Sequence, residues 1–219
     1  ADRRQSFATL ADRVARLAAG LRALGVAERD RVAMLALNSD RYLEFYLACF
    51  WIGAIATPLN ARWSATEVET ALQDSEAAVL LLGENFGVAA VELRRTCPAL
   101  RGVIHVGDGA VPDAQLGYED LLAAHAPIAD QRHGGDAPAF LIYTGGTTGA
   151  PKGVVLSHAN LFTASLGMLA AGCGTHETCL HVAPMFHMAC LQIMTGHYLL
   201  GGTHVIAASF QPLSTLQLI

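Results

Sequence analysis

The chain carries the stretch YTGGTTGAPKG at residues 143–153, between two apolar runs, AFLIY at 139–143 and VVL at 154–156. Its three inner glycines permit backbone angles that are closed to other residues, and they let main-chain N–H groups approach an anion closely. Three threonine hydroxyls add further donors, and Lys152 adds a positive charge near the end of the stretch. These features predict a loop that binds phosphate.

Two common phosphate loops differ from this stretch. A Walker loop has the pattern GxxxxGK[ST], whereas Lys152 follows Pro151 and precedes Gly153, and the GxGxxG pattern of dinucleotide-binding folds is absent. The structural alternative is a glycine- and threonine-rich surface hairpin without a ligand. That alternative gives no role to the threonine pair, Pro151 and Lys152 at this spacing, so we interpret the stretch as a binding loop.

Composition limits the class of protein. The 219 residues are 53% hydrophobic and only 15% charged, which predicts a sizeable core with elements covered on both faces. A net charge of −5 leaves no basic surface for nucleic acid, so no nucleic-acid partner is expected. Five cysteines, odd in number and without a CxxC pair, predict reduced thiols in a cytoplasmic protein rather than a disulfide framework.

No membrane span is expected from the sequence. The charged, amphipathic start does not resemble a signal peptide. The most apolar run, residues 42–59, contains Glu44 and is interrupted by Gly53 and Pro58, so we interpret it as a buried helix followed by a buried strand.

Apolar runs alternate with amphipathic segments along the chain. The short apolar runs predict strands at 31–37, 55–57, 78–82, 102–106, 139–143, 178–183 and 203–207. The amphipathic segments predict helices at 9–24, 41–52, 64–74, 87–95, 118–125, 158–171 and 188–200, with another starting at Pro212. This alternation indicates an α/β fold in which parallel sheets are flanked by helices.

Cap signals mark several helix ends. Thr9 is the expected cap of the first helix and Gly25 its end, and Ser64 with Glu67 forms a capping box. Ser157 is expected to cap the helix at 158–171, and the segment Asn38, Ser39 and Asp40 the helix at 41–52. The polar segment 126–137 is interpreted as a surface connector inside one domain.

The stretch YTGGTTGAPKG resembles the signature loop [ST]xGTTGxPKG of AMP-forming adenylating enzymes, which include acyl-CoA synthetases, aryl-acid ligases and amino-acid adenylation domains. The segments at 9–35, 38–77 and 182–187 (VAPMFH) are similar to the amino-terminal half of an acyl-CoA synthetase. The resemblance covers nearly all of residues 1–219 and implies part of the large N-terminal domain of such an enzyme. The family's later motifs do not appear, so we expect a fragment without catalytic residues of its own and without activity alone.

The resemblance also implies a reaction. The loop would hold the β- and γ-phosphates of ATP while a carboxylic acid attacks the α-phosphorus, and CoA would then take the acyl group. It implies that nucleotide is bound by Thr144, Gly145, Gly146, Thr147, Thr148, Gly149 and Lys152. Thr144 would also contact Mg²⁺, and His187 in PMFHMAC would lie beside the carboxylic acid. The alternative for His187 is a histidine at a helix start that is satisfied by backbone.

A metal site is the rival interpretation for the region after the loop. Five potential ligands lie within fifteen positions, namely Cys173, His176, Cys179, His181 and His187. Their spacing fits no standard zinc pattern, and Cys179 and His181 fall in a strand-like run, so packing in a core is expected instead.

Several alternatives concern substrate and activity. A fatty acid is the first choice, because the apolar segment 188–200 offers an acyl-tunnel lining and because the resemblance places the Gly146 variant among fatty-acyl ligases. Ordinary core is the alternative, and the expected one, for the 188–200 segment. An aryl acid is second and an amino acid third. A different class is a non-catalytic module that binds a nucleotide or a partner. We also expect the loop 144–152 to be mobile without nucleotide, between buried flanks at 139–143 and 154–156.

Overall fold

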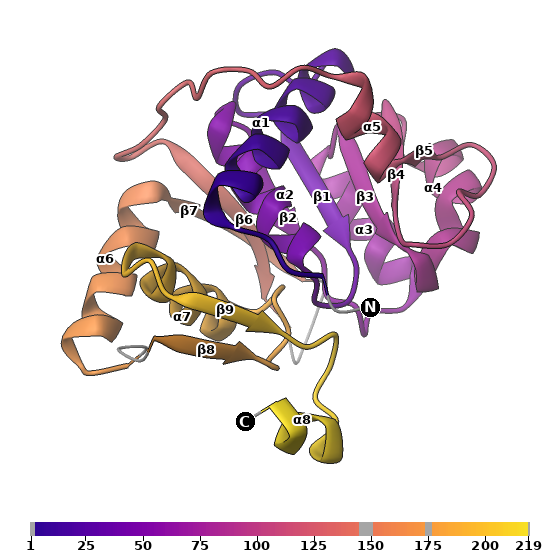
Figure 1. Ribbon diagram of the computed structural model, residues 1–219. Coiled ribbons are helices and arrows are strands. Elements are labelled where there is room, and N and C mark those ends of the chain that lie inside the picture. Colours follow the sequence, from indigo (N-terminus) through magenta and orange to yellow (C-terminus); the bar gives the residue numbers. More distant parts are fainter. Residues whose placement is uncertain (1–2, 145–150, 174–176, 219) are drawn as a thin grey trace.

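The computed structural model describes residues 3–144, 151–173 and 177–218, and within them a seven-stranded sheet and a two-stranded sheet (Figure 1). The large sheet has the order β5-β4-β3-β1-β2-β6-β7. Its strands are β1 (Arg31–Leu35), β2 (Ile55–Pro58), β3 (Val79–Gly83), β4 (Gly102–Val106), β5 (Leu116–Gly117), β6 (Pro138–Thr144) and β7 (Lys152–Ser157). The small sheet joins β8 (Thr178–His181) and β9 (Thr203–Ile206) in parallel.

The large sheet is parallel from β5 to β6, which confirms the predicted α/β class. The last strand differs, because β7 pairs with β6 in antiparallel fashion as the second arm of a hairpin. The predicted strands did not include residues 152–157, and this antiparallel partner of β6 was not foreseen. A loop as short as 145–151 can join antiparallel strands but cannot make the long crossover that a parallel pair needs.

Helices cover both faces of the large sheet, as expected. The helices α1 (Phe7–Ala23), α2 (Asp40–Trp51) and α5 (Tyr118–Ala124) pack on one face, and α3 (Ala65–Ser75) and α4 (Ala90–Thr96) pack on the other. Successive side chains of β1 alternate between these cores: Val32 and Met34 face α2, whereas Ala33 and Leu35 face α3. A short 3₁₀ helix (Glu84–Ala89) precedes α4.

The carboxyl-terminal third of the chain forms a separate layer next to the large sheet (Figure 1). It contains α6 (His158–Ala170), α7 (Met188–Leu199), the β8-β9 sheet and α8 (Pro212–Leu218). Leu191 and Met194 on α7 are buried in the same core as Phe45 and Tyr46 of α2. The predicted core role of the apolar 188–200 segment is thus confirmed for these side chains.

The helix caps at Ser64 and Ser157 agree with the sequence, whereas the cap of the first helix differs. The capping box of Ser64 and Glu67 is present, and Ser157 forms another with Asn160. Thr9, however, lies in the first turn of α1, and its N–H donates to Oγ of Ser6 at 3.1 Å. Ser6 is the cap because its extended backbone directly precedes Phe7.

The flanks of the phosphate loop differ in burial. Ala139 and Phe140 of β6 are buried as predicted, but Val154 and Val155 of β7 are 42% and 58% exposed. The prediction of a buried 154–156 run was wrong for these two residues. As an edge strand, β7 has a neighbouring strand on one side only, so its apolar side chains lack the cover that central strands have.

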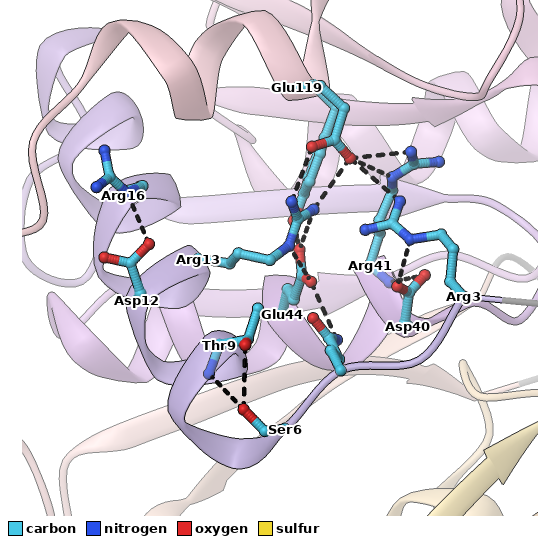
Figure 2. A network of polar contacts seen from close by, with 12 residues as sticks. Arg3, Ser6, Thr9, Asp12, Arg13, Arg16, Asp40, Arg41, Glu44 and Glu119 are labelled. Atoms are coloured by element: carbon cyan, nitrogen blue, oxygen red, sulfur yellow. Dashed lines mark hydrogen bonds and ion pairs between the residues drawn. The ribbon is translucent and has the colours of Figure 1, made fainter.

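A partly buried ion-pair network joins α1, α2 and α5 (Figure 2). Glu44 is fully buried and accepts from Nε of Arg13 at 2.7 Å and from the hydroxyl of Tyr118 at 2.6 Å. Arg13 also pairs with Glu119 at 2.8 Å, and Arg41 pairs with Glu119 at 2.9 Å. Glu44, which interrupts the apolar 42–59 run, is therefore bound by one side chain from α1 and one from α5.

Charge pairing outweighs burial in this network. Burial alone would lower the pKa of the Arg13 guanidinium, but hydrogen bonds to Glu119 and Glu44 raise that pKa above its ordinary value. Burial alone would raise the pKa of Glu119, but hydrogen bonds from Arg13 and Arg41 lower it to about 2. Both groups therefore stay charged at neutral pH.

We predict that Glu44→Ala lowers the free energy of unfolding by about 3–5 kcal/mol, because it leaves the Arg13 charge partly buried without its nearest partner. Urea unfolding measures the change. The matched control is Glu92→Ala, which removes an exposed pair with Arg95 and should leave the unfolding midpoint nearly unchanged. Equal midpoints for the two variants would contradict the prediction.

Candidate functional site

Two residues of the phosphate loop, Thr144 and Lys152, face each other where β6 ends and β7 begins. Thr144 is the last residue of β6, Lys152 is the first residue of β7, and the two form the final pair of the ladder. The Thr144 hydroxyl donates to the Lys152 carbonyl oxygen at 3.4 Å. Gly145, Gly146, Thr147, Thr148 and Gly149 lie outside the described residues, as does the expected mobility of the loop.

Tyr143 fixes the point at which the loop begins. Its hydroxyl donates to Oδ2 of Asp74 at 2.6 Å and contacts the Ala71 carbonyl oxygen at 3.2 Å, both at the end of α3. Its ring meets that of Trp63 edge-on at 6.0 Å. The start of the loop is therefore attached to the helix layer that covers the α3 face of the sheet.

Lys152 is the only lysine among the 219 residues. It lies on the exposed side of the hairpin, and among the described residues no carboxylate forms an ion pair with it. Its cationic ammonium group is therefore available to an anion beside residues 144 and 153. A cation next to a glycine-rich stretch of the sequence suits a phosphate chain.

His187 is the N-cap of α7, where its Nδ1 accepts from the Ala189 N–H at 3.3 Å. This contact is the one expected for a histidine at a helix start. The side chain is exposed. Its role toward a carboxylic acid stays a prediction.

The segment before His187 is attached to the carboxyl end of β1. The Asn38 side chain donates to the Ala183 carbonyl oxygen at 2.8 Å and accepts from the Met185 N–H at 2.7 Å. Asn38 had been expected to help cap α2, but Ser39 is the N-cap and makes no side-chain cap bond. The sequence signal was an asparagine directly after a buried strand, and its partners lie about 145 positions away.

Parallel strands bring these two segments to one edge. Because β1, β2 and β6 are parallel neighbours, their carboxyl ends lie on the same side of the sheet. Ligands of open α/β sheets bind outside that edge. Thr144 at the end of β6 and the Asn38-bound segment beyond β1 both lie there.

Residues 1–219 match the family model of the AMP-binding enzymes. The chain belongs to this family. It is 36% identical to feruloyl-CoA synthase of Amycolatopsis sp over 98% of its length, and 38% identical to a long-chain-fatty-acid–CoA ligase of Thermus thermophilus over 84%. The chain spans 41% and 34% of those two proteins.

A solved structure supports the fold assignment. The inhibitor-bound N-terminal domain of FACL13 from Mycobacterium tuberculosis aligns with all of this chain at a TM-score of 0.86 and 29% identity. The chain covers 54% of that domain. The expected resemblance to N-terminal domains of adenylate-forming enzymes is thereby confirmed.

Two histidines of the small β8-β9 sheet pack together. His181 on β8, which is buried, shares a hydrogen bond of 2.9 Å with His204 on β9, and their rings stack at 5.0 Å. Cys179 lies in the same strand, as predicted. Within the described ranges, no group of three histidine, cysteine or acidic side chains is arranged to hold a metal ion, and His176 lies outside those ranges.

One cavity of the described structure lies away from this edge. It has a volume of about 200 Å³ and is lined by Leu10, Ala11, Val14, Leu47, Phe50, Trp51, Asp130, His133, His158 and Tyr198. His158 donates its backbone N–H to Ala137, just before β6, so the cavity lies at the amino end of the sheet. The ring of His158 packs edge-on against that of Phe50, with 4.9 Å between the ring centroids.

The helices of the described ranges give no membrane-spanning candidate, since none of them is both long and apolar enough to cross a bilayer.

We predict that stability falls as pH is lowered from about 6.5 to about 4. Burial, followed by the charge of neighbouring histidines, lowers the pKa of both His181 and His204 to about 4. In the unfolded chain these groups titrate near pH 6.5, so between the two values the unfolded state binds more protons. Thermal unfolding midpoints measured from pH 7.5 to pH 4 test this.

Replacement of one of these two imidazoles should reduce the dependence of stability on pH. In His204→Phe, the difference between the midpoints at pH 7 and pH 4.5 should be smaller than in the unchanged protein. The contribution of Glu119 does not interfere, because its lowered pKa places its loss of stability between about pH 4.5 and pH 2. An unchanged difference in the variant would show that these imidazoles do not cause the effect.

Proposed function

We propose that this chain provides the phosphate-binding part of an AMP-forming acyl-CoA synthetase. The carboxylate of an acid attacks the α-phosphorus of ATP, which forms an acyl-adenylate and releases pyrophosphate. The thiol of CoA then takes the acyl group and releases AMP. The observation that carries this proposal is the hairpin that ends in Thr144 and Lys152, with YTGGTTGAPKG across its turn, at the carboxyl edge of the sheet.

The residues present suit such a step. Phosphoryl and adenylyl transfers depend mainly on positioning and on stabilisation of charge, and need little covalent chemistry from the protein. Lys152 supplies a cation that pairs with no carboxylate of the described ranges, and Thr144 supplies a hydroxyl that is already oriented across the hairpin. Tyr143 fixes the entry of the loop through Asp74. Gly145, Gly146, Thr147, Thr148 and Gly149 would add the backbone and hydroxyl donors.

Mg²⁺ fits this proposal as a companion of ATP. The ion favours oxygen ligands. Most of these come from water and from substrate phosphates, and few come from the protein. Thr144 offers one exposed neutral oxygen, in keeping with a weak protein contact. Mg²⁺ bound with ATP would neutralise phosphate charge, while Lys152 and Thr144 position the phosphate chain.

The proposed substrate is a carboxylic acid, with a fatty acid placed before an aryl acid and an amino acid third. Similarity extends to a protein named for long-chain fatty acids and to one named for feruloyl-CoA, which supports the first two classes. The apolar side chains of α7 give less support to a fatty acid as lining of an acyl tunnel, because Leu191 and Met194 are buried against α2. His187 is the proposed contact to the carboxylate.

A cytoplasmic location is part of the proposal. All five cysteines are free, and Cys49, Cys97 and Cys190 are buried. Burial raises the pKa of the Cys190 thiol to about 11, so it stays protonated. Reduced, unreactive thiols suit a reducing compartment.

We predict that Lys152→Ala in the full-length protein lowers acid-dependent exchange of pyrophosphate into ATP about 10- to 150-fold. One lost charge-assisted phosphate contact typically costs about 1.5–3 kcal/mol. KM for the acid should change little. Arg132→Ala is the control, since Arg132 is an exposed cation in the connector at the far edge. Exchange that tolerates Lys152→Ala, or that only amino acids support, would contradict the proposal.

The single lysine allows a second test without catalysis. An amine-reactive acetylating reagent should modify Lys152, and ATP with Mg²⁺ should protect it. Peptide mass spectrometry measures the modified fraction at this site. Equal modification with and without nucleotide would contradict the assignment of Lys152 to the phosphate site.

A further inference from the structure

A tight turn sets the position of His187. The His187 N–H donates to the Pro184 carbonyl oxygen at 3.0 Å and closes a four-residue turn. The His187 carbonyl oxygen then accepts from Cys190 at 3.1 Å and from Leu191 at 3.2 Å, which begins α7. The imidazole therefore follows any movement of the 184–187 turn.

Side chains from the first quarter of the chain bind the inner backbone groups of this turn. The Met185 N–H donates to Oδ1 of Asn38 at 2.7 Å, and the Met185 carbonyl oxygen accepts from the Tyr46 hydroxyl at 2.8 Å. Nδ2 of Asn38 donates to the Ala183 carbonyl oxygen at 2.8 Å. The side chain of Met185 is fully buried. Both backbone groups of Met185 thus depend on residues of the β1-α2 segment.

Asparagine suits this position because one short side chain provides a donor and an acceptor together. Asn38 is only 8% exposed, so water does not readily replace it when it is removed. Its own N–H donates to the Ala208 carbonyl oxygen at 3.3 Å, which also ties the segment after β9 to the end of β1. The side chain plays no part in capping α2, where Ser39 is the N-cap.

We infer that Asn38 is a positioning residue for His187 and, through it, for the carboxylic acid. The inference rests on the proposed function and adds to it a role for the Asn38 side chain. Through its two side-chain hydrogen bonds, Asn38 fixes the 184–187 turn relative to the carboxyl end of the central strand β1. β6, which leads into the phosphate loop, is fixed to the same sheet two strands away. Small misplacements between reacting groups reduce rates by up to about 100-fold.

The first experiment compares Asn38→Ala with Asn60→Ala in the full-length protein. Asn60 also follows a strand at this edge, but its side chain accepts from the nearby Arg62 N–H at 2.9 Å and, within the described ranges, bonds to no distant segment. Asn38→Ala should lower kcat/KM for the acid about 10- to 100-fold, with KM for ATP within about twofold. Asn60→Ala should leave both unchanged. Equal losses for acid and ATP in Asn38→Ala would mean general destabilisation and would overturn the inference.

A double-mutant cycle shows whether Asn38 acts through His187. If it does, Asn38→Ala should have little further effect in a His187→Ala background, because the group that it positions is gone. Effects that multiply would overturn the inference, as would full activity of His187→Ala. Tyr46→Phe is the second variant should Asn38→Ala fail to fold. It removes the hydroxyl bond to Met185 and should show the same dependence on His187.

A measurement without catalysis separates this inference from the proposed function. Absence of acid-dependent exchange in the unchanged protein would refute the proposed function alone. The imidazole resonances of His187, followed by NMR, should still shift in Asn38→Ala and stay in place in Asn60→Ala. Unchanged His187 resonances in Asn38→Ala would overturn the positioning role.

Discussion

Parallel pairing of β1, β2 and β6 is the constraint on which the candidate site depends. It brings the carboxyl ends of three strands to one edge, although residues 35 and 144 are far apart in the sequence. The phosphate loop begins at that edge, and the segment that carries His187 is bound there through Asn38. If β1 and β6 ran in opposite directions, these two segments would lie at opposite ends of the strands.

The ion-pair network holds the helices that keep this sheet in place. α1, α2 and α5 each contribute a charged member, so none of the three can shift without separating Glu44 or Glu119 from an arginine. Paired charges of this kind are costly to break once buried. The α2 helix also carries Tyr46, which binds the turn before His187. The network that fixes α2 therefore also helps to fix the turn before His187.

Local patterns predicted most of the elements, whereas contacts between distant segments escaped prediction. The capping box of Ser64 and the strands at 79–83 and 102–106 follow from neighbouring residues, so the sequence was sufficient for them. The exposure of Val155 depends on which strand lies at the edge, and the partners of Asn38 depend on a segment about 145 residues away. The two-residue strand β5 is too short for any periodicity to reveal.

The two parts of the candidate site approach the edge from opposite faces of the sheet. Tyr143 ties the start of the phosphate loop to α3, on one face, while Asn38 and Tyr46 tie the turn before His187 to the core on the α2 face. Neighbouring strands lie about 4.8 Å apart, so β6 and β1 are separated by about 10 Å. In the proposed reaction, the phosphate chain would bind at β6 and the carboxylate near the end of β1. The α-phosphorus would then lie between the two groups, where attack by the carboxylate requires it.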